Sequence, residues 1–224
     1  MPIRSITFDL DGTLLDTIPD LVDGCQRMLA ELGAPMRSAE EIHRFVGKGM
    51  AVLVERCLTW DCAPDTSTLE AGIAAFRRHY VTVNGQKTRI YPGVIEGLNA
   101  FRAAGLPLAV VTNKPGQFTL PLLARMGLAG YFAAVVSGDS TPYKKPHPAP
   151  LHEACAQLGS PASDNLHIGD SENDVLAAHA AGSLAYLVPY GYNEGQSIDN
   201  VKCDALVSDL LAAYRHAFPE ALHD

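Results

Sequence analysis

Two groups of acidic residues carry the chemistry that this sequence suggests. Asp9 and Asp11 stand two positions apart just before Gly12, and Asp170 and Asp174 belong to the segment 169–174. Carboxylates brought close together repel one another, and one of them would take up a proton unless a cation lay between them. A hard divalent cation removes this conflict. Mg²⁺ fits best, because it binds few carboxylates, keeps several waters and accepts a phosphate oxygen.

Thr112 and Lys145 supply groups of the kind that bind phosphate. Thr112 begins the run Thr112-Asn113-Lys114, and Lys145 lies in the proline-containing loop 144–148. A lysine and a metal ion would neutralise phosphoryl oxygens, while a hydroxyl and nearby backbone N–H groups would donate hydrogen bonds to them. An aspartate nucleophile would then form an acyl-phosphate. Together with the carboxylates, these residues indicate phosphoryl transfer.

Each of these segments also has a structural explanation when it is taken alone. An Asp-Gly pair is typical of a turn, and a serine or aspartate often caps a helix. The functional interpretation is favoured because all of the segments follow predicted strands. Open α/β sheets bind ligands beyond the carboxyl ends of their strands, so we expect these side chains to meet at one edge of a sheet.

The strands are predicted from short β-branched and apolar runs, at residues 3–10, 106–112, 132–137, 166–168, 184–188 and 205–207. Helical patterns alternate with them, first around Val94, Leu98 and Phe101, and then at 116–126, 149–158, 172–181 and 208–217. Strands that alternate with helices indicate parallel pairing. The expected fold class is therefore α/β, with a doubly wound, Rossmann-like parallel sheet as its core.

Residues from about 17 to 86 show helical patterns only. The first helix is expected to begin near Thr17, and Ser38 and Glu41 have the spacing of a capping box. Apolar side chains then recur at helical spacing up to Tyr80. We expect an all-helical cap domain at 17–90, inserted into a core domain made of 1–16 and 91–224, with hinges near Thr17 and at 91–93.

The composition argues against several classes of protein. The formal net charge is −8, and no run of lysine and arginine exceeds two residues, whereas proteins that bind nucleic acid usually carry a basic patch. The five cysteines form no C-x-x-C pair, so neither a zinc site nor a disulfide framework is indicated. No signal peptide is recognised, and apolar stretches fall short of the ~18 residues that span a bilayer. We expect a cytoplasmic protein without nucleic-acid or membrane partners; its oligomeric state, monomer or homodimer, stays open.

Taken in order, these segments resemble the four motifs of the haloacid dehalogenase superfamily of phosphohydrolases. The resemblance covers essentially the whole chain and implies Asp9 as the nucleophile and Asp11 as the general acid and base. Asp11 would protonate the leaving alkoxide and then activate the water that hydrolyses the aspartyl-phosphate. Dehalogenase members lack an acid two residues after the nucleophile, so the presence of Asp11 favours phosphate chemistry.

The resemblance also implies how the other residues divide their roles. Mg²⁺ would be held by the carboxylates of Asp9 and Asp170 and by the backbone carbonyl of Asp11, with Asp174 in support. The phosphoryl group would be held by Thr112, Asn113 and Lys145. The expected partner is a small phosphorylated metabolite.

Within the superfamily, the chain is most similar to bacterial phosphoglycolate phosphatases, on the run 8–17, the turn Phe45-Val46-Gly47-Lys48-Gly49 and the segment 145–148. This similarity implies hydrolysis of 2-phosphoglycolate to glycolate and phosphate. If the turn closes over the site, Lys48 would meet the substrate carboxylate; the alternative is a solvated helix–helix turn.

Three alternatives remain from the sequence. The substrate can be another small metabolite, such as a sugar phosphate, a nucleotide or pyrophosphate. A phosphosugar mutase of the same superfamily would use a sugar hydroxyl in place of water. A binding protein without turnover ranks lowest, because both Asp9 and Asp11 are present.

Overall fold

The structure is a computed structural model and describes residues 2–219. Its centre is a six-stranded sheet in the order β5-β4-β1-β6-β7-β8, in which all neighbouring strands are parallel. Each expected strand is present, with ends within two residues of the prediction. The strands are β1 (Ser5–Phe8), β4 (Leu108–Val111), β5 (Ala134–Val136), β6 (Asn165–Gly169), β7 (Leu184–Leu187) and β8 (Ala205–Leu206).

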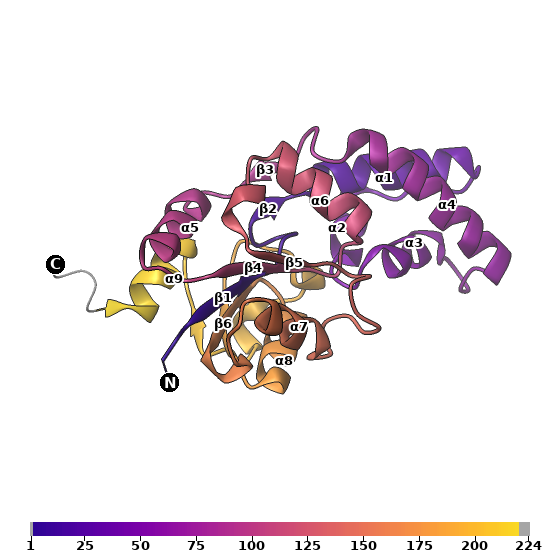
Figure 1. Cartoon of the computed structure of the whole chain (residues 1–224). Helices are drawn as coiled ribbons and strands as arrows, with labels where there is room; N and C mark the ends of the chain where they lie inside the picture. Colours follow the sequence, from indigo (N-terminus) through magenta and orange to yellow (C-terminus); the bar gives the residue numbers. More distant parts are fainter. Residues whose placement is uncertain (1, 220–224) are drawn as a thin grey trace.

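Helices cover both faces of this sheet, which confirms the doubly wound α/β fold. One apolar cluster joins the sheet to α5 (Val94–Ala103), α6 (Gly116–Arg125) and α9 (Leu210–Ala217). A second cluster joins the opposite face to α7 (Ala149–Gln157) and α8 (Glu172–Ala181). In Figure 1, α5 and α9 lie at one side of the sheet, and α7 and α8 lie below it.

The central strand β1 is buried on both faces, but its two faces differ in chemistry. Ile6 and Phe8 enter the apolar cluster of α5, α6 and α9. Ser5 donates a 3.1 Å hydrogen bond to Asn165 Oδ1, and the Thr7 hydroxyl lies 2.9 Å from His167 Nδ1. Buried polar groups are tolerated only when they are hydrogen-bonded. These pairs fix β1 against β6, the two strands whose ends carry the acidic residues.

Four helices follow β1 and form a unit with an apolar core of its own. They are α1 (Ile18–Glu31), α2 (Ala39–Phe45), α3 (Met50–Leu58) and α4 (Thr66–Val83). The capping box at the start of α2 is present, with Ser38 and Glu41 hydrogen-bonded in both directions. Figure 1 shows these helices gathered at the end of the molecule opposite α5 and α9. The expected all-helical cap is therefore confirmed as part of the fold.

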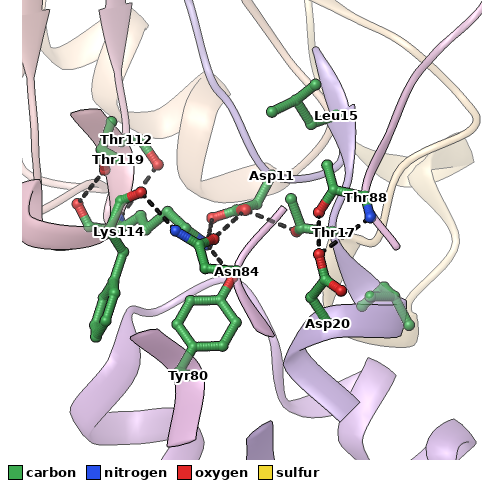
Figure 2. A network of polar contacts seen from close by, with 12 residues as sticks. Asp11, Leu15, Thr17, Asp20, Tyr80, Asn84, Thr88, Thr112, Lys114 and Thr119 are labelled. Atoms are coloured by element: carbon green, nitrogen blue, oxygen red, sulfur yellow. Dashed lines mark hydrogen bonds and ion pairs between the residues drawn. The ribbon is translucent and has the colours of Figure 1, made fainter. Parts of the chain in front are cut away.

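A two-stranded antiparallel ribbon connects the cap to the sheet, and the sequence did not predict it. It consists of β2 (Leu15–Asp16) and β3 (Arg89–Ile90). Strands of two residues are too short to show a period of two. Next to the ribbon, the Asp20 carboxylate accepts hydrogen bonds from the backbone N–H groups of Gly85, Lys87 and Thr88 and from the Thr88 hydroxyl. This buried carboxylate ties the start of α1 to the chain that leaves the cap (Figure 2).

Within residues 2–219, no helix combines the length and the apolar character needed to cross a bilayer.

Candidate active site

The carboxyl ends of the central strands bring the predicted residues to one edge of the sheet. Asp9 follows β1, Thr112 follows β4 and Asp170 follows β6. The loop after β5 adds Lys145, whose ammonium lies 2.9 Å from Asp9 Oδ1. Residues from distant parts of the sequence thus meet at the place where an open α/β sheet binds its ligands.

A cluster of three carboxylates forms the centre of the site. One oxygen from each of Asp9, Asp170 and Asp174 lies within 4.8 Å of the other two. Burial, reinforced by the neighbouring Asp174 and Asp11 and opposed by Lys145, raises the pKa of Asp9 to about 7. Burial together with Asp174 and Asp9 also raises the pKa of Asp170 well above its ordinary range. Carboxylates so placed are costly to ionise unless a cation joins them.

Asp9 offers this cluster an oxygen that no directed hydrogen bond fixes. Its Oδ1 is buried and receives no well-directed hydrogen bond from the described residues, although the Lys145 ammonium is close. A buried oxygen without a hydrogen bond is uncommon in a folded protein and needs an explanation, of which an ion is one. The donor set contains oxygen only, so it fits a hard divalent cation.

Asp170 is held in place by two hydrogen bonds and by the close approach of two glycines. Its Oδ1 accepts a 3.1 Å hydrogen bond from the Thr13 hydroxyl, and its Oδ2 accepts one of 2.6 Å from Tyr192 N. Gly12 has a φ of +93°, and a Cβ there would lie 2.4 Å from Asp170 Oδ2. A Cβ on Gly191 would lie 2.2 Å from Asp170 Cβ. Both glycines are needed because a side chain at either position would displace this carboxylate.

Asp174 has a different role from the other two carboxylates, because its oxygens already have partners. Oδ1 accepts from Lys145 Nζ at 2.6 Å and lies 3.1 Å from His167 Nε2, and Oδ2 accepts from the Ser171 hydroxyl at 2.6 Å. Burial opposes the charge, but Lys145 and His167 outweigh it and lower the pKa of Asp174 below its ordinary value. Asp174 therefore holds Lys145, whereas the sequence had placed it in support of the metal ligands. His167 was missed, since a lone histidine in a strand gives no sequence signal.

Asn113 holds the lysine loop rather than pointing freely into the site. Its Oδ1 accepts a 2.9 Å hydrogen bond from Lys145 N, and its Nδ2 donates to the carbonyls of Lys145 and Gly47, both at 3.0 Å. Gly47 belongs to the cap turn 45–49. The Asn113 amide thus joins three segments of the chain, whereas the sequence had grouped this residue with the phosphate ligands.

Asp11 lies beside the carboxylate cluster and faces the cap. Its Oδ1 accepts hydrogen bonds from the Thr17 hydroxyl at 2.7 Å and from Lys114 Nζ at 3.0 Å. Lys114 Nζ also donates to Tyr80 Oη at 2.8 Å, and Figure 2 shows this chain of contacts from core to cap. Burial opposes the ammonium charge, but Asp11 and Tyr80 outweigh it and raise the pKa of Lys114 above its ordinary value.

Lys114 was not among the predicted site residues, and Tyr80 was expected only as part of the cap core. The available signal for Lys114 was its position two residues after Thr112, at the same strand end. No comparable signal marks Tyr80. Its ring is packed in the core of the cap, and only the fold shows that its hydroxyl reaches the site.

A cavity of about 50 Å³ lies between the sheet edge and the cap. Its polar lining includes Asp9, Asp11, Thr112 and Asn113, and side chains of the cap form an apolar wall. Lys48 does not line this cavity. Its ammonium lies 3.3 Å from Glu194 Oε1 on the outer side of the cap turn, so the structure does not bring Lys48 together with the other predicted residues.

Comparisons with known proteins agree with the geometry. A family model described as haloacid dehalogenase-like hydrolase matches residues 6–188. A protein of Nitrosospira multiformis named phosphoglycolate phosphatase is 49% identical over 215 residues, 95% of each chain. A protein of Thiobacillus denitrificans with the same name is 45% identical, also over 95% of each chain.

Solved structures show the same fold. A crystal structure described as a predicted phosphoglycolate phosphatase from Haemophilus somnus has a TM-score of 0.90 and 33% identity, and it covers 96% of this chain and 97% of its own. This chain and the matched structure therefore share one fold over nearly their whole lengths. This chain belongs to the haloacid dehalogenase-like hydrolase family.

Proposed function

We propose that this chain is a Mg²⁺-dependent phosphomonoester hydrolase whose substrate is 2-phosphoglycolate. The observation that carries the proposal is the buried Asp9 Oδ1, which lies 2.9 Å from the Lys145 ammonium without a well-directed hydrogen bond, within a cluster of three carboxylates. This arrangement offers a nucleophilic oxygen and a cation to one phosphoryl group. The names of the relatives in Nitrosospira multiformis and Thiobacillus denitrificans support the choice of substrate.

Asp9 acts as the nucleophile in this proposal. One of its oxygens attacks phosphorus, which forms an aspartyl-phosphate and breaks the bond between phosphorus and the ester oxygen. Asp11 gives its proton to the leaving alkoxide of glycolate. In the second half, Asp11 takes a proton from a water that attacks the same phosphorus, and the bond to Asp9 breaks. The products are glycolate and phosphate, and both aspartates return to their starting states.

The remaining residues bind and orient the phosphoryl group. The Lys145 ammonium neutralises its oxygens, and the Thr112 hydroxyl, which lines the same cavity, donates to them. Asn113 and Asp174 keep Lys145 in place. When bound, Mg²⁺ supplies further neutralisation of charge at the phosphoryl oxygens. It would be held by the carboxylates of Asp9 and Asp170 and by the Asp11 backbone carbonyl.

Residues 17–90 form the cap domain in this proposal, and the core consists of 1–16 and 91–224, of which residue 1 and 220–224 fall outside the described part. The ribbon of β2 and β3 lies at both boundaries, so the hinges near Thr17 and at 91–93 flank it. Cap opening admits the substrate, and closure excludes bulk water. We place the enzyme in the cytoplasm.

Phosphate release from a panel of esters tests this function. The panel contains 2-phosphoglycolate, hexose and pentose phosphates, nucleotides and pyrophosphate, each with Mg²⁺ and with EDTA. We expect the highest kcat/KM for 2-phosphoglycolate and no release in EDTA. A higher kcat/KM for another ester would refute 2-phosphoglycolate as the substrate, while the proposed phosphatase mechanism would stand. Absence of release from every ester, combined with isomerisation of a phosphosugar, would indicate a mutase.

A further inference from the structure

Lys114 is a cation built into the wall of the cavity between core and cap. Its side chain is 4% exposed, and it is the one lysine or arginine among the described residues that line the cavity. Lys145, the other buried lysine of the site, binds the phosphoryl group in the proposed function and is paired with two carboxylates, whereas Lys114 is paired with Asp11 alone. The positive charge offered to the non-phosphoryl part of a ligand is therefore that of Lys114.

The hydrogen-bond donors of Lys114 and Tyr80 are not all used. A lysine ammonium has three N–H groups. Here Nζ lies 3.0 Å from Asp11 Oδ1 and 2.8 Å from Tyr80 Oη, and its third contact, with Asp11 Oδ2, is longer at 3.3 Å. The Tyr80 oxygen accepts from Lys114, and the described residues offer no acceptor for its own O–H. A buried hydroxyl normally finds a partner. The Tyr80 O–H thus remains for a ligand, and the Lys114 N–H that makes the long contact with Asp11 Oδ2 can turn to the same ligand.

Tyr80 is held rigidly, so its hydroxyl has a fixed position. Its ring stacks on Phe76 with the centroids 5.0 Å apart and meets Phe118 edge-on at 4.9 Å. The Lys114 ammonium lies 4.9 Å from the centroid of the same ring. Pre-organised donors lose little entropy when they bind a ligand.

The cap side of the wall is apolar, and the cavity gives little space. Leu21, Met50 and Leu53 line the cap side of the cavity, and such surroundings strengthen a charge–charge contact. A volume of about 50 Å³ holds only a few water-sized groups, at about 10–15 Å³ each. The ligand group that matches a cation, a second donor and little space is a planar anion with two acceptor oxygens on a short chain.

We propose that Lys114 and Tyr80 form a carboxylate-binding subsite that selects phosphomonoesters of short hydroxy acids. The inference rests on the proposed function, because it assigns the recognition of the glycolate end of the substrate. In the complex, Lys114 links Asp11 to the substrate carboxylate, and Tyr80 donates its O–H to the second carboxylate oxygen. This brings the leaving-group end of the ester close to the proposed acid.

The test compares two esters that differ in the carboxylate, 2-phosphoglycolate and 2-hydroxyethyl phosphate. Tyr80→Phe removes the donor and keeps the ring, and Tyr131→Phe is the matched control, because Tyr131 lies outside the cavity lining and its hydroxyl contacts Asn99. We expect Tyr80→Phe to lower kcat/KM for 2-phosphoglycolate about tenfold, mainly through KM. In the same variant, kcat/KM for 2-hydroxyethyl phosphate should stay within about twofold of the wild-type value. The inhibition constant of glycolate should rise by about the same factor as KM for 2-phosphoglycolate.

Lys114→Met gives a second test, because it removes the charge and keeps an unbranched side chain that is one atom shorter. It should lower both activities by loosening Asp11, and it should lower the activity on 2-phosphoglycolate at least tenfold more. If each variant lowered kcat/KM equally for both esters, the proposed subsite would be refuted. Lys114 would then be a positioning residue for Asp11 only. An unchanged KM for 2-phosphoglycolate in Tyr80→Phe would overturn the subsite as well.

A second pair of esters separates this inference from the proposed function. 3-Phosphoglycerate and glycerol 3-phosphate also differ in a carboxylate. If the wild type shows no preference for 2-phosphoglycolate in the panel, the proposed substrate fails. The subsite is then tested by the ratio of kcat/KM within this second pair, which Tyr80→Phe should reduce about tenfold; an unchanged ratio would contradict it.

Discussion

Asn113 and Lys145 exchange two hydrogen bonds that close a ring between a strand end and a loop. Lys145 N donates to Asn113 Oδ1 at 2.9 Å, and Asn113 Nδ2 donates back to the Lys145 carbonyl at 3.0 Å. The same Nδ2 donates to the Gly47 carbonyl of the cap turn. One buried amide therefore fixes the backbone of the proposed phosphate-binding lysine and joins it to the cap.

Asn113→Asp should be markedly destabilising. The change replaces an N–H₂ group that donates to two carbonyls with an oxygen that repels them, at a buried position. We expect a loss of roughly 2–4 kcal/mol in the free energy of unfolding, measured by denaturant titration. Asn99→Asp is the matched control at an exposed position and should cost less than about 0.5 kcal/mol. Equal stability of the two variants would show that the amide does not hold the loops.

The raised pKa of Asp9 predicts a pH-dependent stability in the absence of metal. The pKa is about 7 in the folded protein, against an ordinary value of 3.8. The folded state therefore binds this proton more tightly. The corresponding stability is complete below about pH 4 and is lost as the pH rises through about 7. Asn cannot ionise, so metal-free Asp9→Asn should gain thermal stability over the wild type at about pH 8.

Melting temperatures at two pH values check this expectation. The advantage of Asp9→Asn should be several degrees at about pH 8 and should become small at about pH 4, where the wild-type carboxyl is protonated in the folded state and in much of the unfolded chain. Adding Mg²⁺ at about pH 8 should stabilise the wild type more than the variant. An advantage of the same size at both pH values, with and without Mg²⁺, would contradict the buried charge as its cause.

Glu194 holds the cap turn from the core side through Arg56 rather than chiefly through Lys48. Its Oε2 accepts from Arg56 Nη2 at 2.6 Å, while Lys48 Nζ is 3.3 Å from Oε1 and more exposed. Arg56→Met should therefore loosen closure and raise KM for 2-phosphoglycolate about fivefold, equivalent to about 1 kcal/mol. Lys48→Met should change KM less than about twofold.

These two variants also decide between two views of Lys48. The sequence-based hypothesis directs Lys48 to the substrate carboxylate, whereas the structure pairs it with Glu194. If Lys48→Met raises KM more than Arg56→Met does, Lys48 reaches the substrate in the closed enzyme and the pairing with Glu194 is secondary. Steady-state kinetics with 2-phosphoglycolate are sufficient for this comparison.

The sheet and its helices were predictable because their signals are local. Each of the six strands is a short apolar run, and the capping residues Ser38 and Glu41 mark a helix start by spacing alone. The ribbon of β2 and β3 was not predictable, since its two-residue strands pair across the whole cap. Pairing over such a distance leaves no periodic pattern in the sequence.

The site was predictable where chemistry coincides with a strand end, as at Asp9 and Asp170. It was not predictable where a side chain reaches the site from another layer. Tyr80 has the helical spacing of a core residue and fills the core with its ring, yet its hydroxyl contacts Lys114. The direction of Lys48 depends on Glu194, which is distant in sequence. Such contacts follow from tertiary packing, not from local spacing.

The central claim is that Asp9 becomes covalently phosphorylated. The most direct measurement mixes the wild type, which keeps both the acid and the base, with 2-phosphoglycolate and Mg²⁺, quenches it in acid within the first turnover and analyses its peptides by mass spectrometry. We predict one phosphoryl group on the peptide that contains Asp9, and none when Asp9→Asn is treated in the same way. A phosphoryl group on another residue, or substantial turnover by Asp9→Asn, would contradict the covalent mechanism.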